Sequence, residues 1–157
     1  MTNAEKTVAL LTQKGWRITF AESCTGGKAA AALVDVASAS GVFDASFVTY
    51  ANEAKIKYLG VSEETIAACG VVSEPVALEM AVGAARQAGA QVGVGISGIA
   101  GPAGGTKEKP VGMVCFGFWF DGEGFAATKQ FGPLGRNAVR DAAVAFVYET
   151  LLAYLDR

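Results

Sequence analysis

The spacing of hydrophobic and polar positions changes repeatedly between the period of an amphipathic helix and that of a short buried strand. Apolar residues at helical spacing, with polar residues at their starts, predict helices over residues 2–15, 28–36, 52–58, 73–89 and 136–155, and a further helix starting at Ser62. Runs rich in β-branched and aromatic residues predict strands over residues 17–21, 45–50, 91–97, 112–120 and 125–131. Helices and strands therefore alternate along most of the chain.

Several helix boundaries are marked by residues that can satisfy unpaired backbone groups. Thr2 and Glu5 fit a capping box, and Gly15 fits a C-terminal cap for the same helix. Asn52 and Ser62 are candidate N-caps for the two helices that follow the second strand. These signals fix where the helices should begin.

The order of the elements predicts the fold class. Strands alternate with helices at first, and the last two strands are joined by Asp121-Gly122-Glu123-Gly124, which favours a hairpin. This order predicts an α/β fold, a three-layer α/β/α domain with a mixed, mostly parallel sheet. The chain has 157 residues without a repeat or linker, so we expect a single domain over residues 1–157.

The composition is that of a globular domain in the cytoplasm. Apolar residues make up 52% of the chain and charged residues 18%, which excludes a disordered or fibrous protein. Cys24, Cys69 and Cys115 form no CxxC pair and no even set, which favours a reducing compartment. The first residues lack the basic region and apolar core of a signal peptide, and no apolar stretch is long enough to span a membrane.

The chain contains no histidine, and this excludes many kinds of catalytic site. Neither a Ser-His-Asp nor a Cys-His arrangement can form within the chain, and a zinc site with histidine ligands is excluded as well. A hydrolase of this sequence would have to use Lys, Tyr, Asp, Glu or a terminal amine as its base. The net charge of −2 leaves no basic footprint for nucleic acid, so no nucleic-acid partner is expected.

The first candidate site is the segment AESCTGGK, residues 21–28, between the end of a strand and the start of a helix. Ligands of open α/β sheets bind at such positions, and the free N–H groups of a helix start favour anions. Ser23 and Thr25 supply hydroxyls there, while Gly26 and Gly27 allow close approach of the backbone to a ligand. The alternative is a capped turn without function, and Cys24 could be the nucleophile in place of Ser23.

The second candidate site is the segment VTYANEAK, residues 48–55, where another strand gives way to a helix. Tyr50 would lie at the end of the sheet, and Lys55 would project from the first turn of the helix. The dipole at a helix start lowers the pKa of a lysine, and a lowered pKa is what a lysine base needs. The alternative is a solvated surface lysine next to Lys57.

The third candidate site is the segment ISGIAGPAGG, residues 96–105, where the strand that we expect to be most buried gives way to a Gly-rich loop over residues 98–110. With Ser97, Gly98 and Gly101 it could bind a phosphate or supply N–H groups to an oxyanion, although its spacing matches neither a P-loop nor a GxGxxG motif. Arg136 and Arg140, one helical turn apart, could bind an anion together. The alternatives are an ordinary flexible loop and an ordinary charged helix surface.

Taken in order, AESCTGG, FVTYANEAK, GVVSEP and GISGIAGPAGGTKEKPVG resemble the C-terminal domain family of the competence/damage-inducible protein CinA. The resemblance covers nearly the whole chain and implies a three-layer α/β/α domain of a stand-alone nicotinamide-nucleotide amidase, without the N-terminal domain of longer relatives. It implies the conversion of nicotinamide mononucleotide and water to nicotinate mononucleotide and ammonia. By this resemblance the serine nucleophile falls on Ser23, and the functional tyrosine and lysine fall on Tyr50 and Lys55.

These inferences predict a site in which Ser23 attacks the carboxamide carbon and neutral Lys55, helped by Tyr50, accepts the hydroxyl proton. Backbone N–H groups near Thr25 and Gly26 would stabilise the oxyanion. The residues expected to bind the nucleotide are Thr25, Gly26, Gly27, Asn52, Ser97, Gly98, Gly101 and Arg136.

No metal or organic cofactor is expected, and the partner is a small nucleotide substrate. A homodimer is compatible with the apolar content and the hairpin. Two other functions stay open: a nucleotide-binding module without catalytic activity, and a partner protein in competence or DNA repair.

Overall fold

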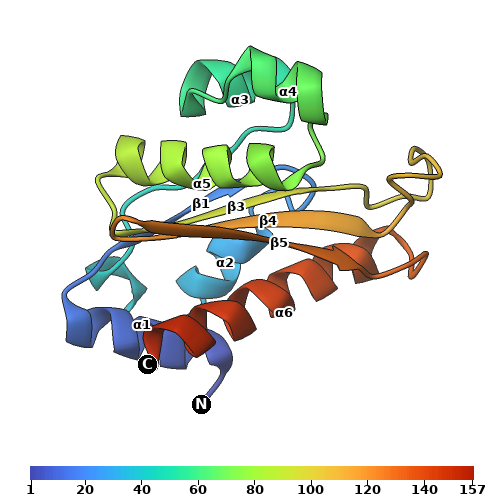
Figure 1. The fold of residues 1–157 in the computed structure, drawn as a ribbon. Helices are drawn as coiled ribbons and strands as arrows, with labels where there is room; N and C mark the ends of the chain where they lie inside the picture. Colours follow the sequence, from blue (N-terminus) through green and yellow to red (C-terminus); the bar gives the residue numbers. More distant parts are fainter.

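The computed structural model describes all residues from 1 to 157 and arranges them in three layers, with helices on both faces of one sheet (Figure 1). The strands are β1 (Ile18–Glu22), β2 (Phe47–Val48), β3 (Val92–Gly98), β4 (Met113–Phe120) and β5 (Glu123–Gln130). The helices are α1 (Asn3–Lys14), α2 (Lys28–Val34), α3 (Asn52–Leu59), α4 (Glu63–Cys69), α5 (Glu74–Ala88) and α6 (Arg136–Leu155), with one 3₁₀ turn at Ala39–Gly41. None of the helices is both long enough and apolar enough to cross a membrane.

The five strands form one sheet in the order β2-β1-β3-β4-β5. β1 pairs in parallel with β2 and β3, while β4 pairs antiparallel with both β3 and β5. Four strands therefore run in one direction and β4 alone runs against them. The prediction of a mixed, mostly parallel sheet in a three-layer α/β/α domain is confirmed.

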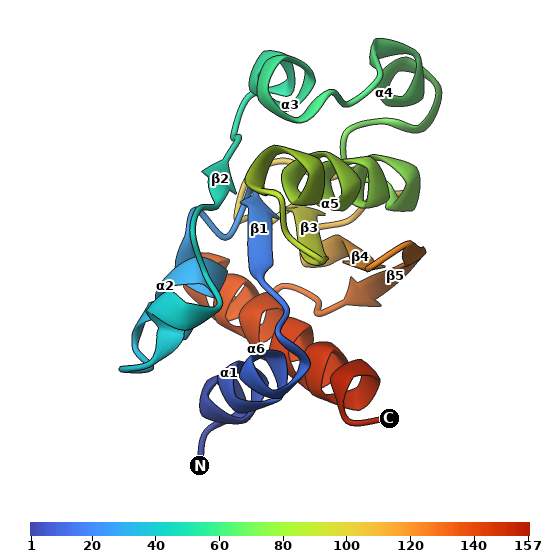
Figure 2. The same cartoon turned by 90° about the vertical axis from the view of Figure 1, so that its left-hand side faces the viewer.

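The helices divide between the two faces of the sheet. α5 packs directly on one face with α3 and α4 outside it, whereas α1, α2 and α6 cover the other face (Figures 1 and 2). The larger hydrophobic core lies on the α6 side, where the rings of Phe116 and Phe146 are 4.6 Å apart. This division places α3 and α6 on opposite sides of the end of β1, where the candidate site lies.

Glycines on β3 and β4 let α5 approach the sheet closely. A Cβ on Gly95 would lie 2.0 Å from the carbonyl oxygen of Ala77 in α5, and one on Gly117 would lie 2.3 Å from the same oxygen. Contacts this short would force α5 away from the sheet if either glycine carried a side chain.

Gly95→Ala is therefore expected to destabilise the fold by about 2 kcal/mol or more, which lowers the melting temperature of a chain of this size by several degrees. Gly41→Ala is the matched control, because a Cβ there meets nothing within 4 Å and its φ is not positive. Thermal unfolding of both variants by circular dichroism measures the difference. Equal melting temperatures would show that α5 can shift without cost.

Most predicted boundaries agree with the structure, and two predictions near the site are wrong. The capping box of Thr2 and Glu5 is present, and Ser62 caps α4. The second strand has two residues, Phe47–Val48, because only these pair with β1. Asn52 is not an N-cap: it is the first residue of α3, and the cap residue is Ala51, which makes no side-chain hydrogen bond there.

Candidate active site

Ser23 lies in the turn between β1 and α2, at the carboxyl end of a strand that has parallel neighbours on both sides. Its backbone N–H donates to the carbonyl oxygen of Ile96 at 3.0 Å, which fixes the start of the turn against β3. The residue is half-buried, so its hydroxyl can meet both the protein and a ligand. This is the position at which parallel sheets bind ligands.

The Lys55 amine is in hydrogen-bond contact with the Ser23 hydroxyl. The Nζ–Oγ distance is 3.1 Å, and Nζ also lies 2.7 Å from the carbonyl oxygen of Thr49 and 3.1 Å from that of Tyr50. The Lys55 side chain is 1% exposed, so the alternative of a solvated surface lysine is wrong. Lys57, two residues on, is exposed as a surface lysine would be.

In the structure Nζ donates to all three oxygens, which uses the three N–H donors of a charged ammonium. In the neutral amine two N–H donors can still serve the carbonyls of Thr49 and Tyr50, and the lone pair can accept the Ser23 hydroxyl proton. Burial lowers the pKa of Lys55 below its ordinary value of 10.5 because the charged form loses its hydration. No carboxylate forms an ion pair with Lys55 to offset this effect.

The turn after Ser23 depends on two glycines with left-handed backbone conformations. Gly26 has a φ of 59° and Gly27 a φ of 100°, and residues with side chains rarely adopt such angles. The Gly26 N–H donates to the carbonyl oxygen of Ser23 at 3.0 Å, which removes it from the predicted oxyanion donors. The N–H groups of Cys24, Thr25 and Gly27 have no hydrogen-bond partner in the protein; Thr25 is fully buried, whereas Gly27 is partly exposed.

The hydroxyls of Thr25 and Thr49 are buried and have no hydrogen-bond partner. Thr25 was expected to contact substrate through its hydroxyl as well as its backbone. An unpaired buried hydroxyl is rare and costs stability, and because Thr25 is fully buried its hydroxyl does not face a ligand in this structure.

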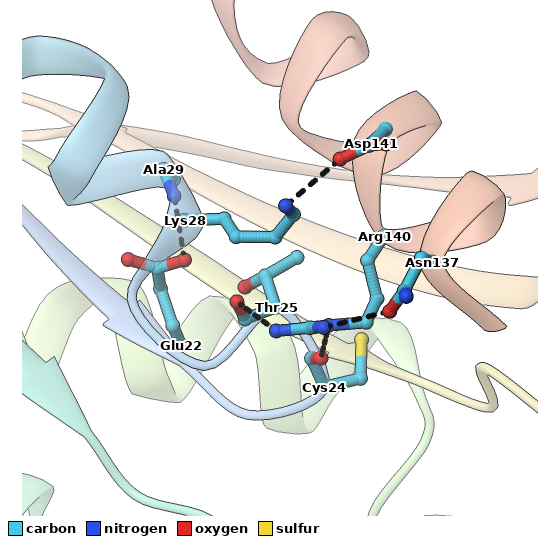
Figure 3. Close-up of polar contacts among 8 residues, drawn as sticks. All are labelled: Glu22, Cys24, Thr25, Lys28, Ala29, Asn137, Arg140 and Asp141. Atoms are coloured by element: carbon cyan, nitrogen blue, oxygen red, sulfur yellow. Dashed lines mark hydrogen bonds and ion pairs between the residues drawn. The ribbon is translucent and has the colours of Figure 1, made fainter.

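The Glu22 side chain caps the start of α2, the helix that follows the turn. Its two carboxylate oxygens accept from the N–H groups of Ala29 at 2.9 Å and Ala30 at 3.0 Å, as Figure 3 shows for Ala29. The side chain is fully buried, and the positive end of the helix dipole favours a carboxylate there. Glu22 is thus bound to α2 and is not positioned as the base for Ser23.

The environment of the Cys24 thiol does not suit a nucleophile. Its side chain is 6% exposed, and burial raises the pKa of the thiol to about 11. The reactive form of cysteine is the thiolate, which is scarce at neutral pH under these conditions. The structure therefore favours Ser23 over Cys24.

Tyr50 and Arg136 form a polar edge beside the Gly-rich loop. One Arg136 nitrogen donates to the Tyr50 hydroxyl at 3.0 Å and another donates to the carbonyl oxygen of Gly101 at 2.9 Å. The Tyr50 side chain is 63% exposed, and it is its backbone carbonyl, not its phenol, that contacts Lys55. Tyr50 is thus joined to Lys55 through its backbone and to Arg136 through its side chain.

The structure places the other predicted substrate-binding residues in different environments. Asn52 is exposed at the start of α3 and is free to meet a ligand. Gly98 ends β3, where a Cβ would lie 2.7 Å from the Val114 side chain, so packing explains this glycine. Ser97 is buried and its hydroxyl donates to the carbonyl oxygen of Val71 at 2.8 Å, which leaves it out of the proposed substrate site.

Two contributions to the site were missed by sequence reasoning. One is the Thr49 carbonyl, which accepts from Lys55 but gives no signal in a sequence because every residue has a carbonyl. The other is the contact of Arg140 with the turn after Ser23: its guanidinium donates to the carbonyl oxygens of Cys24 at 2.8 Å and Thr25 at 3.1 Å (Figure 3). Arg140 was expected to bind an anion together with Arg136, but each of its three nitrogens already donates to the protein.

A comparison with known protein families assigns the chain to one of them. The sequence profile of the CinA C-terminal domain matches residues 1–155. The chain belongs to the CinA C-terminal domain family. The expectation drawn from the four motifs is confirmed.

Relatives of known name and structure agree with this assignment. The chain is 53% identical to nicotinamide-nucleotide amidohydrolase PncC of Enterobacter agglomerans, over 92% of this chain and 88% of that protein. It is 49% identical to the PncC of Escherichia coli K12, over 94% of this chain and 90% of that protein. The crystal structure of the competence/damage inducible protein CihA from Agrobacterium tumefaciens superposes with a TM-score of 0.93 at 40% identity, over 100% of this chain and 98% of that one.

Proposed function

We propose that this chain is a nicotinamide-nucleotide amidohydrolase, which converts nicotinamide mononucleotide and water to nicotinate mononucleotide and ammonia. The observation that carries the proposal is the contact between the Ser23 hydroxyl and the buried Lys55 amine, since it supplies an activated nucleophile in a chain without histidine. The names of two relatives at about half identity support the choice of substrate. A serine paired with a neutral lysine is suited to acyl transfer from an amide.

In the first half of the reaction, Ser23 Oγ forms a bond to the carboxamide carbon as its proton passes to Lys55. The carbonyl oxygen becomes an oxyanion, for which the unpaired backbone N–H groups of the turn after Ser23 are the proposed donors, with that of the partly exposed Gly27 among them. Lys55 then gives the proton to the amide nitrogen, the C–N bond breaks and ammonia leaves. What remains is a nicotinoyl ester on Ser23.

In the second half, water attacks the ester carbon and gives a proton to Lys55. The bond between that carbon and Ser23 Oγ breaks, and the proton returns from Lys55 to the serine. Nicotinate mononucleotide leaves, and the enzyme is restored with Lys55 neutral. The first and the last of these four proton transfers use the contact at 3.1 Å between the amine and the hydroxyl, and in the other two Lys55 exchanges a proton with the amide nitrogen and with water.

The polar edge of Tyr50 and Arg136 is the proposed contact for the nucleotide phosphate. The Arg136 side chain is exposed at the start of α6, and a guanidinium suits phosphate oxygens. Gly101, whose carbonyl accepts from Arg136, and Asn52, two residues after Tyr50 at the start of α3, are proposed as further contacts.

The experiment that tests the function is incubation of the purified protein with nicotinamide mononucleotide, followed by measurement of ammonia. We expect steady release of ammonia from the mononucleotide and a much lower kcat/KM for nicotinamide riboside, which has the same amide but no phosphate. The same assay with free nicotinamide serves as the second comparison. A protein that is stabilised thermally by the mononucleotide but releases no ammonia would be a binding module, and the proposal would be wrong.

A further inference from the structure

We infer that Lys109 is a positioning residue for substrate binding, which fastens the Gly-rich loop to the end of α4 and so holds in place the Gly101 carbonyl that orients Arg136. This inference rests on the proposed function, because it assigns a part in binding the phosphate of the same substrate. It joins two motifs that the proposed mechanism does not use, GVVSEP at residues 70–75 and GTKEKPVG at residues 105–112.

The Lys109 side chain reaches from the Gly-rich loop to the connection between α4 and α5, and both segments lie at the end of the sheet where α6 begins (Figure 1). Its Nζ donates to the carbonyl oxygen of Cys69, the last residue of α4, at 2.5 Å. The last carbonyls of a helix lack intrahelical partners, and the helix dipole favours a cation beside them. No carboxylate forms an ion pair with Lys109, so the Cys69 carbonyl is the partner that fixes its amine.

Gly70, the first residue of the GVVSEP motif, makes room for this amine. A Cβ at position 70 would lie 2.6 Å from the Lys109 Nζ and 3.8 Å from its Cε. The φ of 79° at Gly70 favours glycine independently. A side chain at this position would push the amine away from the Cys69 carbonyl.

The backbone of the Gly-rich loop is closed where it leaves and rejoins the sheet. The Ile99 N–H donates to the Met113 carbonyl oxygen at 2.9 Å, and the Gly112 N–H donates to the Ile99 carbonyl oxygen at 2.8 Å. The residues between these bonds therefore form one compact surface loop, a kind of segment that often carries function.

Contacts inside the loop connect Lys109 with Gly101. The Thr106 N–H donates to the Lys109 carbonyl oxygen at 2.8 Å, and the Lys109 N–H donates to the Thr106 Oγ1 at 3.0 Å. Val111, two residues after Lys109, lies so close to Gly101 that a Cβ there would be 2.5 Å from the Val111 Cγ1. A hold on Lys109 is therefore also a hold on Gly101.

The loop in turn orients Arg136. The Nη1 of Arg136 donates to the Gly101 carbonyl oxygen at 2.9 Å, and its Nη2 donates to the Tyr50 hydroxyl at 3.0 Å. A guanidinium has five N–H donors, so three remain for a ligand. Because Arg136 is exposed, an unheld side chain would lose rotamer freedom on binding, and orienting it beforehand reduces that cost.

The test compares Lys109→Met with Lys107→Met in the ammonia assay. Lys107 is the matched control, because it lies in the same loop, is exposed and forms no ion pair. We expect Lys109→Met to raise KM for nicotinamide mononucleotide roughly 3- to 10-fold with kcat nearly unchanged, and Lys107→Met to keep both constants. Lys109→Arg is expected to keep part of the affinity, because a guanidinium can donate to the same carbonyl.

Three further measurements separate positioning from a general loss of order. With nicotinamide riboside, which has no phosphate, Lys109→Met is expected to keep the kcat/KM of the wild type. Added to Arg136→Met, Lys109→Met is expected to raise KM little further, because two residues that act through one contact are not additive. Hydrogen exchange of the loop amides is expected to be faster in Lys109→Met than in Lys107→Met, a readout that does not depend on activity.

Equal KM for Lys109→Met and Lys107→Met would overturn the inference, and so would equal hydrogen exchange of their loops. Effects of Lys109→Met and Arg136→Met that multiply in the double variant, or an equal loss of kcat/KM for the riboside, would give Lys109 a structural role alone and also overturn it. If the wild-type protein releases no ammonia, the proposed function fails. The calorimetric Kd of the mononucleotide then takes the place of KM, and equal values in the two lysine variants would overturn the inference separately.

Discussion

Ser23→Ala is expected to abolish the release of ammonia from nicotinamide mononucleotide while the binding of the nucleotide stays measurable. The Ser23 Oγ is the group that contacts the Lys55 amine, and alanine leaves nothing to form the ester intermediate. Removal of a serine nucleophile from a group that acts as a unit lowers kcat by about 10⁴-fold or more. The measurement is single-turnover ammonia release together with the thermal shift caused by the mononucleotide.

Cys24→Ala is the matched control for this prediction, because it removes the neighbouring nucleophilic side chain. The Cys24 thiol is buried and burial raises its pKa to about 11, so the variant is expected to keep most of the activity. An inactive Cys24→Ala with an active Ser23→Ala would exchange the two assignments.

The fold was predictable because its signals are local. The capping residues at Thr2 and Ser62 mark helix starts that the structure shares, and the continuous apolar run of 92–96 marks the central strand β3. The short strand β2 was overestimated because its sequence has the composition of a strand over six residues, whereas only Phe47 and Val48 find partners on β1. Pairing depends on the neighbouring strand, which the pattern of one segment does not show.

The candidate site was predictable to the extent that it depends on strand ends. Ser23 and Lys55 follow two strands that the fold places side by side, so their contact over 32 positions follows from the topology. The contact of Arg140 with the turn after Ser23 could not be predicted, because it depends on backbone carbonyls more than a hundred positions away in the chain. Ser97 shows the reverse case, since a serine at the end of a strand looks the same in sequence whether it meets a ligand or the Val71 carbonyl.

The activity of the wild-type enzyme is expected to rise with pH as Lys55 loses its proton. Burial lowers the pKa of Lys55 below its ordinary value of 10.5, and only the neutral amine can accept the Ser23 proton. The rising limb of kcat/KM against pH should therefore have its midpoint below 10.5, and it reports the free enzyme. Because the unfolded chain binds the proton more tightly than the folded one, the free energy of unfolding should also rise with pH between the lowered pKa and 10.5.

Lys55→Met is expected to remove this limb and to lower kcat/KM by roughly 10²- to 10⁴-fold, the usual contribution of a general base. Lys55→Arg is not expected to restore activity, because a guanidinium does not lose its proton in this range. Lys57→Met is the control, since Lys57 is exposed on the same helix, and it should keep both the rate and the pH profile. The rise of the unfolding free energy with pH should also flatten in Lys55→Met and persist in Lys57→Met, which separates the titration of Lys55 from the chemistry that it serves. A fully active Lys55→Met would refute the serine–lysine mechanism, and the base would then have to be sought among groups that do not contact the Ser23 hydroxyl in this structure.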